Sequence, residues 1–162
     1  MAVGERNLIV CRHAKSAWPD ELDDFERPLH ERGLRDAPAA GRWLRENTTA
    51  LDFAVCSPAT RARKTWRLVS AEFGTEVHAQ YDKRVYGATA GQLIEVINEL
   101  PDSAGTAVLV GHNPGLEELV TALTGTTYEL RTCSIAVIAG NGSWSDVEPG
   151  WGKLDTSATP RG

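Results

Sequence analysis

Asn7-Leu-Ile-Val-Cys-Arg12 is a short apolar run with β-branched residues, and it predicts a buried strand near the start of the chain. Phe53-Ala-Val-Cys56 and Thr106-Ala-Val-Leu-Val-Gly111 are runs of the same kind and predict two further strands. We also expect a strand at Ser134–Ala139 and a short one at residues 76–78. These five segments set the framework of the predicted fold.

The segments between these strands carry helix signals. Ser57-Pro58 and Asn113-Pro114 each resemble an N-cap followed by a proline at the first helical position. Thr89 and Gln92 have the spacing of a capping box. Pro38 should kink or interrupt the first helix, because proline has no amide to donate. The predicted helices cover about residues 30–46, 57–73, 89–100 and 113–124.

Strands that alternate with helices indicate parallel βαβ units. We therefore predict an α/β fold, a three-layer sandwich with a mostly parallel central sheet flanked by helices. Asn141-Gly142 is a hairpin signal, which predicts a sixth, partly exposed strand around 143–147 and an antiparallel edge. No linker divides the chain, so residues 1–162 should form a single domain, with 1–6 and about 155–162 as mobile tails.

Composition excludes several classes of protein. The chain has 162 residues, 41% apolar and 24% charged, which is typical of soluble globular proteins. The net charge of −5 argues against nucleic-acid binding. No apolar stretch approaches the roughly 18 residues needed to span a bilayer, and the first residues lack a signal segment. We therefore expect a cytoplasmic protein with no nucleic-acid or membrane partner, and a monomer fits the sequence.

Cysteine usage points to the same compartment. Cys11, Cys56 and Cys133 lie far apart and form no C-x-x-C pair. Three scattered cysteines are typical of reduced thiols, and they exclude a disulfide scaffold or a cysteine-rich zinc module. We interpret all three as small buried hydrophobic residues.

Charged and polar side chains follow three of the predicted strands at their carboxyl ends. In sheets of this kind, ligands bind beyond those ends, so the side chains should meet there. Arginine forks bind phosphoryl oxygens bidentately, helix N-termini favour anions, and a neutral imidazole can attack phosphorus. The pattern therefore predicts a phosphoryl site. The residues concerned are Arg12 and His13 after the first strand, Ser57 with Arg61 and Arg63 after the second, and His112 with Asn113 after the fourth.

Four stretches together resemble the histidine phosphatase superfamily. They are Leu8-Ile-Val-Cys-Arg12-His13-Ala14-Lys15-Ser16, Arg27-Pro-Leu29 with Arg32-Gly33, Ser57-Pro58-Ala59-Thr60-Arg61, and Gly111-His112-Asn113-Pro114. The first and last forms are particular to the short, SixA-like phosphohistidine phosphatase branch. The resemblance runs in order from about Leu8 to Leu154. It implies an α/β sandwich fold.

The same resemblance implies a phosphate pocket and a mechanism. The pocket would contain Arg12, His13, Arg61 and His112, with His13 as the nucleophile that becomes phosphorylated. No metal and no organic cofactor would be needed. The implied activity is that of a phosphatase with a phosphohistidine intermediate, acting on phosphohistidine carried by a protein partner.

Further site residues follow from their positions beside the motifs. Lys15, Ser16 and Asn113 could contact the phosphate or the partner, or serve as ordinary loop residues. Related phosphatases place an acid after the third strand, where Asp82 is the only carboxylate of Tyr81–Tyr86. Asp82 is the candidate general acid, and a surface turn residue is the alternative. This weak acid signal, with a short 74–105 segment that leaves little material for a lid, favours phosphohistidine on a protein.

Two other functions remain open from the sequence. One is a phosphomonoesterase or mutase for small phosphorylated metabolites, which would use the same chemistry. The other is a non-catalytic module that recognises phosphate through the same pocket. A nucleotide-binding domain is disfavoured because neither G-x-x-x-x-G-K-[ST] nor G-x-G-x-x-G follows the first strand, and no zinc-ligand spacing is present.

Overall fold

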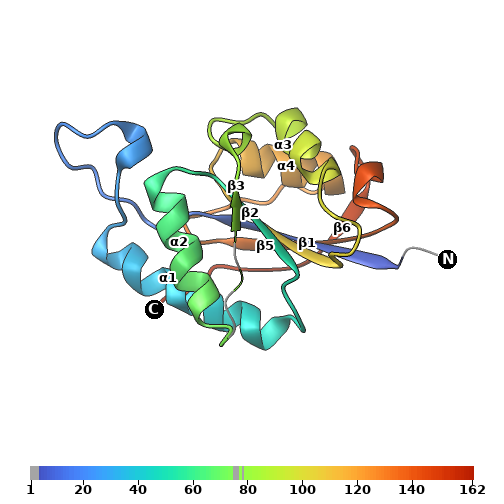
Figure 1. Cartoon of the computed structure of the whole chain (residues 1–162), viewed down its shortest axis with the longest axis horizontal. Coiled ribbons are helices and arrows are strands. Elements are labelled where there is room, and N and C mark those ends of the chain that lie inside the picture. Colours follow the sequence, from blue (N-terminus) through green and yellow to red (C-terminus); the bar gives the residue numbers. More distant parts are fainter. Residues whose placement is uncertain (1–3, 75–76, 78) are drawn as a thin grey trace.

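The computed structural model describes residues 4–74, 77 and 79–162, and a six-stranded sheet runs through its centre (Figure 1). The strands lie in the order β3-β2-β4-β1-β5-β6. Neighbours from β3 to β1 are parallel, whereas β5 pairs antiparallel with both β1 and β6. The predicted mostly parallel sheet with an antiparallel edge is therefore confirmed. The bounds are β1 Glu5–Arg12, β2 Phe53–Cys56, β3 Ala79–Tyr81, β4 Thr106–Gly111, β5 Ile135–Asn141 and β6 Gly152–Ala158.

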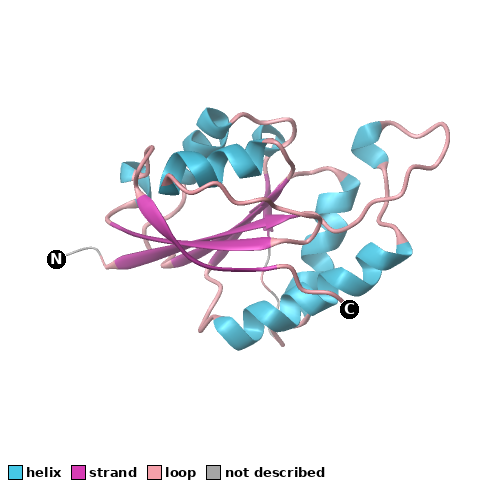
Figure 2. Ribbon diagram, turned by 180° about the vertical axis from the view of Figure 1, so that it is seen from behind, coloured by secondary structure: helices cyan, strands magenta, loops and turns pink. Residues whose placement is uncertain are grey.

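Helices cover both faces of this sheet, as Figures 1 and 2 show from opposite sides. Residues of β1 alternate between two cores, because successive side chains of a strand point to opposite faces. Leu8 and Val10 pack with α3 and α4, and Ile9 and Cys11 pack with α1 and α2. The three-layer α/β sandwich is therefore confirmed. The helices are α1 Glu31–Asn47, α2 Thr60–Ala71, α3 Ala90–Asn98 and α4 Gly115–Thr124, with short 3-10 helices η1 Asp24–Glu26, η2 Lys83–Val85 and η3 Trp144–Asp146.

The four predicted helices are present, with corrections at the starts of α2 and α4 and at Pro38. α4 begins at Gly115 with Pro114 as its N-cap, so Asn113 is not the cap and Pro114 is not the first helical residue. The capping box of Thr89 and Gln92 forms at the start of α3. By contrast, α2 begins at Thr60 rather than at Ser57, whose hydroxyl accepts from the Ala59 amide at 3.2 Å in the turn before the helix. The predicted interruption at Pro38 is wrong, because α1 continues through this residue. The buried side of α1 packs into the core. No helix of the described residues is long and apolar enough to cross a membrane.

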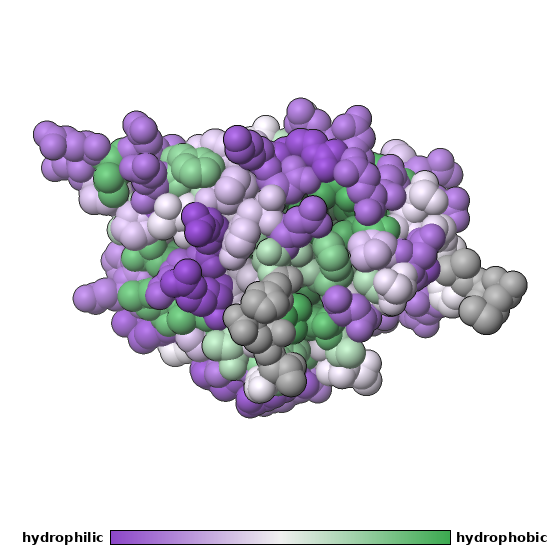
Figure 3. Space-filling view, viewed as in Figure 1, coloured by the Kyte–Doolittle hydropathy of each residue, from purple (hydrophilic) through white to green (hydrophobic). Residues whose placement is uncertain are grey.

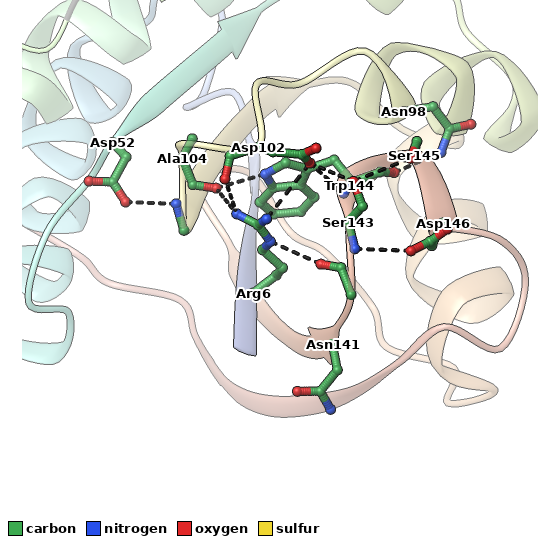
Figure 4. Close-up of polar contacts among 12 residues, drawn as sticks. Arg6, Asp52, Asn98, Asp102, Ala104, Asn141, Ser143, Trp144, Ser145 and Asp146 are labelled. Carbon is green, nitrogen blue, oxygen red and sulfur yellow. Dashed lines mark hydrogen bonds and ion pairs between the residues drawn. The ribbon is translucent and has the colours of Figure 1, made fainter. Parts of the chain in front are cut away.

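The sixth strand does not lie at 143–147 as predicted. These residues form η3 and its flanks, where the Ser143 amide donates to Asp146 Oδ2 at 3.0 Å. The fully buried Trp144 anchors them, and its indole donates to the Ala104 carbonyl at 2.7 Å. Figure 4 shows Arg6 beside this indole, bonded to the carbonyls of Asp102 and Ala104 at 2.7 and 2.8 Å. A short 3-10 helix that begins at a buried tryptophan therefore stands where the sixth strand was predicted.

The antiparallel edge is β6, which extends into the segment predicted to be a mobile tail. Residues 156–158 pair with β5, and beyond them Arg161 Nη1 lies 3.1 Å from Asp36 Oδ2 in α1. The segment from 155 to 162 is therefore not an unpaired tail. At the other end, Glu5 and Arg6 belong to β1, and residues 1–3 lie outside the described residues. Glu76 and His78, two residues of the strand predicted at 76–78, also lie outside the described residues. The short strand that the structure describes next to this segment is β3, at Ala79–Tyr81.

Candidate active site

A cavity of about 520 Å³ opens at the carboxyl ends of β1, β2 and β4. Its position follows the rule for ligands in sheets of this kind. The segment between β1 and α1, which carries η1, projects beyond the sheet beside the start of α2 (Figures 1 and 2). Figure 3 shows mainly hydrophilic side chains on this projecting segment. Of the predicted site residues, the cavity brings together Arg12, His13, Lys15, Ser16, Arg61, His112 and Asn113.

His13 lies at the buried base of the cavity, with 6% of its surface exposed. Its backbone is held by β4 and by the loop before β5, since its amide donates to the Gly111 carbonyl at 3.1 Å and its carbonyl accepts from the Cys133 amide at 3.0 Å. Nδ1 lies 2.8 Å from the Ala14 carbonyl oxygen. Because a carbonyl can only accept, we assign the ring proton to Nδ1, which leaves the lone pair on Nε2.

Charge and burial keep this imidazole neutral. Burial is the main cause that lowers the pKa of His13 to about 3, the hydrogen bond to Ala14 opposes it, and the nearby His112, Arg61 and Arg12 add smaller contributions in the same direction as burial. A neutral ring with a free Nε2 is the form of histidine that can act as a nucleophile at neutral pH.

His112 faces His13 across the cavity, with ring centroids 5.1 Å apart. Its Nε2 lies 2.7 Å from Ser57 Oγ. Among the described residues, Nε2 is the one acceptor recorded for this buried hydroxyl, so we assign the hydroxyl proton to the bond with Nε2, which puts the ring proton of His112 on Nδ1. Burial, followed by the charge of Arg61, lowers the pKa of His112 to about 4. Ser57, which was predicted both at the phosphoryl site and as a helix cap, is not among the described lining residues and meets the site through this bond to His112.

Unpaired hydrogen-bonding groups converge on this cavity. Within the described ranges, the buried side-chain nitrogens and oxygens that lack a partner are Arg12 Nε, Arg61 Nε and His112 Nδ1. Buried polar groups in folded proteins are normally satisfied, and all three belong to one site. Two of them are guanidinium donors, and the third is a donor in the tautomer assigned above. This arrangement suits a bound anion with several acceptor oxygens, such as a phosphoryl group.

Asp24 of η1 lines the cavity, although it was not among the site residues predicted from the sequence. Arg61 donates to its carbonyl at 2.6 Å and to Oδ2 at 3.0 Å. Tyr86 donates to Oδ2 at 2.6 Å, and Arg27 Nε donates to Oδ1 at 3.1 Å. The Tyr86 hydrogen bond and the two arginines hold the pKa of the Asp24 carboxyl well below its usual range. The only sequence signal for this role was its position three residues before the Arg27-Pro-Leu29 motif.

The remaining lining residues have distinct contacts. Ser16 is buried and accepts from Arg27 Nη1 at 2.8 Å, and the Arg27 guanidinium carbon lies 3.4 Å from the ring centroid of the exposed Trp18. The Asn113 amide donates to the Leu130 carbonyl at 2.8 Å, so it fixes the loop before β5. Lys15 is exposed at the rim.

Asp82, the candidate general acid, is not among the described residues that line the cavity. Its carboxylate caps η2 and lies 2.7 Å from Arg84 Nη2, which also pairs with Glu99. The hydrogen bond from Arg84 lowers the pKa of Asp82, so the group is held as an anion. The structure gives Asp82 the alternative role of a turn residue at the surface.

The described part of the chain contains no group of three or more His, Cys, Asp or Glu side chains arranged to hold a metal ion. Cys11, Cys56 and Cys133 are buried free thiols, in agreement with their interpretation as hydrophobic residues.

Comparisons with known sequences identify relatives over nearly the whole chain. A family model described as "Histidine phosphatase superfamily (branch 1)" matches residues 8–106. An uncharacterized protein of Mycobacterium tuberculosis is 42% identical over 161 residues, which cover 93% of this chain and 99% of the relative. A 2,3-bisphosphoglycerate-dependent phosphoglycerate mutase of Beijerinckia indica is 38% identical over 74 residues, which cover 44% of this chain and 36% of the mutase.

Solved structures extend the similarity to the fold. A candidate phosphohistidine phosphatase SixA from Nakamurella multipartitia has a TM-score of 0.88 at 27% identity, with 99% of both chains covered. A protein histidine phosphatase SixA complexed with tungstate has a TM-score of 0.83 at 19% identity, covering 95% of this chain and 97% of that one. These structures share the architecture of the present chain along its length.

Proposed function

This chain belongs to the histidine phosphatase superfamily, in its SixA-like branch, and we propose that it hydrolyses phosphohistidine on a protein through a phosphorylated His13. The family and the SixA-like fold support phosphatase activity. One observation carries the finer proposal: a buried, neutral His13, with its proton held on Nδ1 by Ala14, presents Nε2 in a cavity with unpaired arginine donors.

The proposed reaction has two steps. In the first, His13 Nε2 attacks phosphorus, a new P–N bond forms, and the bond to the leaving imidazole breaks with its electron pair going to that imidazole. In the second, the oxygen of water attacks phosphorus, the P–N bond to His13 breaks with its electron pair returning to Nε2, and inorganic phosphate leaves with both hydrogens of the water. Arg12, Arg61 and His112 stabilise the oxygens of the transferring group, so catalysis rests on positioning and electrostatics.

The acid–base groups of the cavity support a P–N substrate. Among the described lining residues, Asp24 is the only carboxylate, and its arginine and tyrosine partners keep it ionised. An alkoxide leaving group needs a proton donor, and general acid help is typically worth about 10²–10⁴-fold. An imidazole, which leaves in a neutral form when its other nitrogen is protonated, does not need that help.

The rim of the cavity supports a protein substrate. Trp18 is 74% exposed and lines the opening beside Lys15. An exposed aromatic residue beside a charged pocket is typical of surfaces that meet another protein. We propose that Lys15 contacts the phosphate or the partner, and that Ser16 and Asn113 act by holding Arg27 and the loop before β5.

A panel of substrates tests the proposal. We expect kcat/KM to be highest for a phosphohistidine protein, intermediate for aryl phosphates, and lowest for phosphoserine and sugar phosphates. The similarity to phosphoglycerate mutases favours a second candidate, an enzyme for small phosphorylated metabolites. Faster turnover of glycerate or sugar phosphates than of phosphohistidine would establish that candidate instead. Binding of phosphopeptide without release of phosphate would indicate a recognition module.

A further inference from the structure

We propose that Asp24 is a catalytic residue whose carboxylate contacts the leaving imidazole and favours cleavage of P–N bonds over P–O bonds. This inference rests on the proposed function, since it concerns how the same cavity selects its substrate. It gives a role to a carboxylate that lies in an anion-binding cavity, where a negative charge is otherwise unfavourable for a phosphoryl ligand.

The relative depth of Asp24 and His13 places the carboxylate on the leaving-group side. His13 is 6% exposed at the base of the cavity, whereas the side chain of Asp24 is 49% exposed. In an in-line displacement, the attacking and leaving atoms lie on opposite sides of phosphorus. An attack by His13 from the base therefore directs the leaving group outward, toward the mouth where Asp24 lies.

Asp24 keeps acceptor capacity for this contact. A carboxylate offers about four lone-pair positions, and the structure fills three of them from the side chains of Arg61, Tyr86 and Arg27. These bonds come from α2, from the residue after η2, and from the residue after η1. They fix the carboxylate in one orientation, and Oδ1 retains a free position. His112 is a further titratable group that lies close enough for its pKa to respond to the Asp24 charge.

The chemistry of phosphohistidine explains why an anion helps. The phosphoryl group occupies one ring nitrogen, and the second nitrogen carries a proton only when the ring is cationic. From the protonated ring, the P–N bond breaks with its electron pair going to nitrogen, and neutral imidazole leaves. From the unprotonated ring, the product would be imidazolate, a far poorer leaving group. A carboxylate that accepts a hydrogen bond from the second nitrogen stabilises the protonated ring and offsets the field of the arginines.

A phosphate ester gains nothing from this contact. Its leaving oxygen has no proton to donate to Asp24, and the negative charge that develops on that oxygen is repelled by the carboxylate. The same group therefore accelerates P–N cleavage and opposes P–O cleavage. This difference separates the proposed role from a purely structural one, in which Asp24 only orients Arg61 and Arg27 and affects all substrates alike.

Asp24→Asn tests the proposal with two matched substrates, N-phosphoimidazole and phenyl phosphate. We expect the ratio of their kcat/KM values to fall at least tenfold in the variant. Asp23→Asn is the matched control, because it removes the same charge one residue away, from a side chain without a capping hydrogen bond. The control should keep the wild-type ratio, and Asp24→Glu should keep more of it than Asp24→Asn.

The pH dependence of kcat gives a second readout that needs no variant. kcat reports groups in the bound complex, so its alkaline decline with N-phosphoimidazole should lie at a higher pH than the ring pKa of the free substrate. Equal losses for both substrates in Asp24→Asn, or a decline at or below the solution ring pKa in the wild type, would overturn the role of Asp24. Absence of any wild-type turnover of N-phosphoimidazole or phosphohistidine would instead overturn the proposed function.

Discussion

Replacing Ser57 by alanine removes the group that orients His112. Ser57 is fully buried, and its Oγ lies 2.7 Å from His112 Nε2. In the variant, Nε2 loses its partner inside the protein, which costs about 1–3 kcal/mol for a buried polar group. The ring can then recover part of this cost by moving its proton from Nδ1 to Nε2. Either change weakens the donor that His112 offers to the phosphoryl group.

The expected loss of activity can be worked out from the energy of this hydrogen bond. If about 1–3 kcal/mol of transition-state stabilisation is lost, kcat/KM falls by about 5- to 150-fold, since 1.36 kcal/mol corresponds to tenfold. The assay is hydrolysis of an aryl phosphate, with imidazole nitrogen NMR to report which nitrogen of His112 carries the proton. Ser57→Thr, which keeps the hydroxyl, is the matched variant and should retain most of the activity.

A loss of overall stability must be separated from the effect of the substitution on His112. Ser57 Oγ also accepts from the Ala59 amide, so Ser57→Ala should lower the melting temperature modestly. Kinetics are therefore measured well below that temperature. Full activity in Ser57→Ala, with the His112 proton still on Nδ1, would refute the reasoning, because it would show that the hydroxyl does not determine the state of the ring.

Three further predictions concern stability, measured by thermal or urea unfolding. Gly33→Ala should destabilise the protein by about 1–3 kcal/mol, because a Cβ would overlap the backbone of the loop after His13, whereas Gly91→Ala at an open position of α3 should be neutral or stabilising. Arg161→Ala should lower the free energy of unfolding by about 1–3 kcal/mol, since it removes an ion-pair partner of the buried Asp36. An unchanged melting temperature would show that this C-terminal contact does not stabilise the fold. The lowered pKa values of the two cavity histidines mean that the unfolded chain binds more protons between about pH 6.5 and 4. Stability should therefore be complete above pH 6.5 and fall by up to about 1.4 kcal/mol per pH unit for each histidine below it, and His13→Ala should flatten this decline.

Much of the sheet could be predicted because its strands are continuous apolar runs buried on both faces. β2 and β4 have the predicted bounds, and β1 begins only two residues earlier than expected. The sixth strand could not be placed by the same rule. The hairpin signal of Asn141-Gly142 predicted a partly exposed strand at 143–147, but Trp144 is fully buried there and begins η3. The actual β6 is polar and largely exposed, so its sequence carries little strand signal.

The residues of the site divide in a similar way. His13 and His112 could be found because each directly follows a buried strand, and the carboxyl ends of parallel strands share one edge. Ser57 could be placed at the same edge, but its bond to His112 could not be predicted. Asp24 and Tyr86 could not be found, since their roles depend on contacts with residues far away in the chain. Asp82 shows the opposite error, in which position along the chain suggested an acid but its pairing with Arg84 keeps it at the surface.

Trapping of the phosphorylated enzyme tests the central claim most directly. Wild-type protein and His13→Ala are mixed with a phosphoryl donor labelled in phosphorus, quenched in alkali within the first turnover, and digested for peptide mapping. We expect an acid-labile, alkali-stable phosphate on His13 of the wild type, with kcat reduced by several orders of magnitude in the folded variant. Label on another residue, or near-normal turnover by His13→Ala, would contradict the assignment of His13 as the nucleophile.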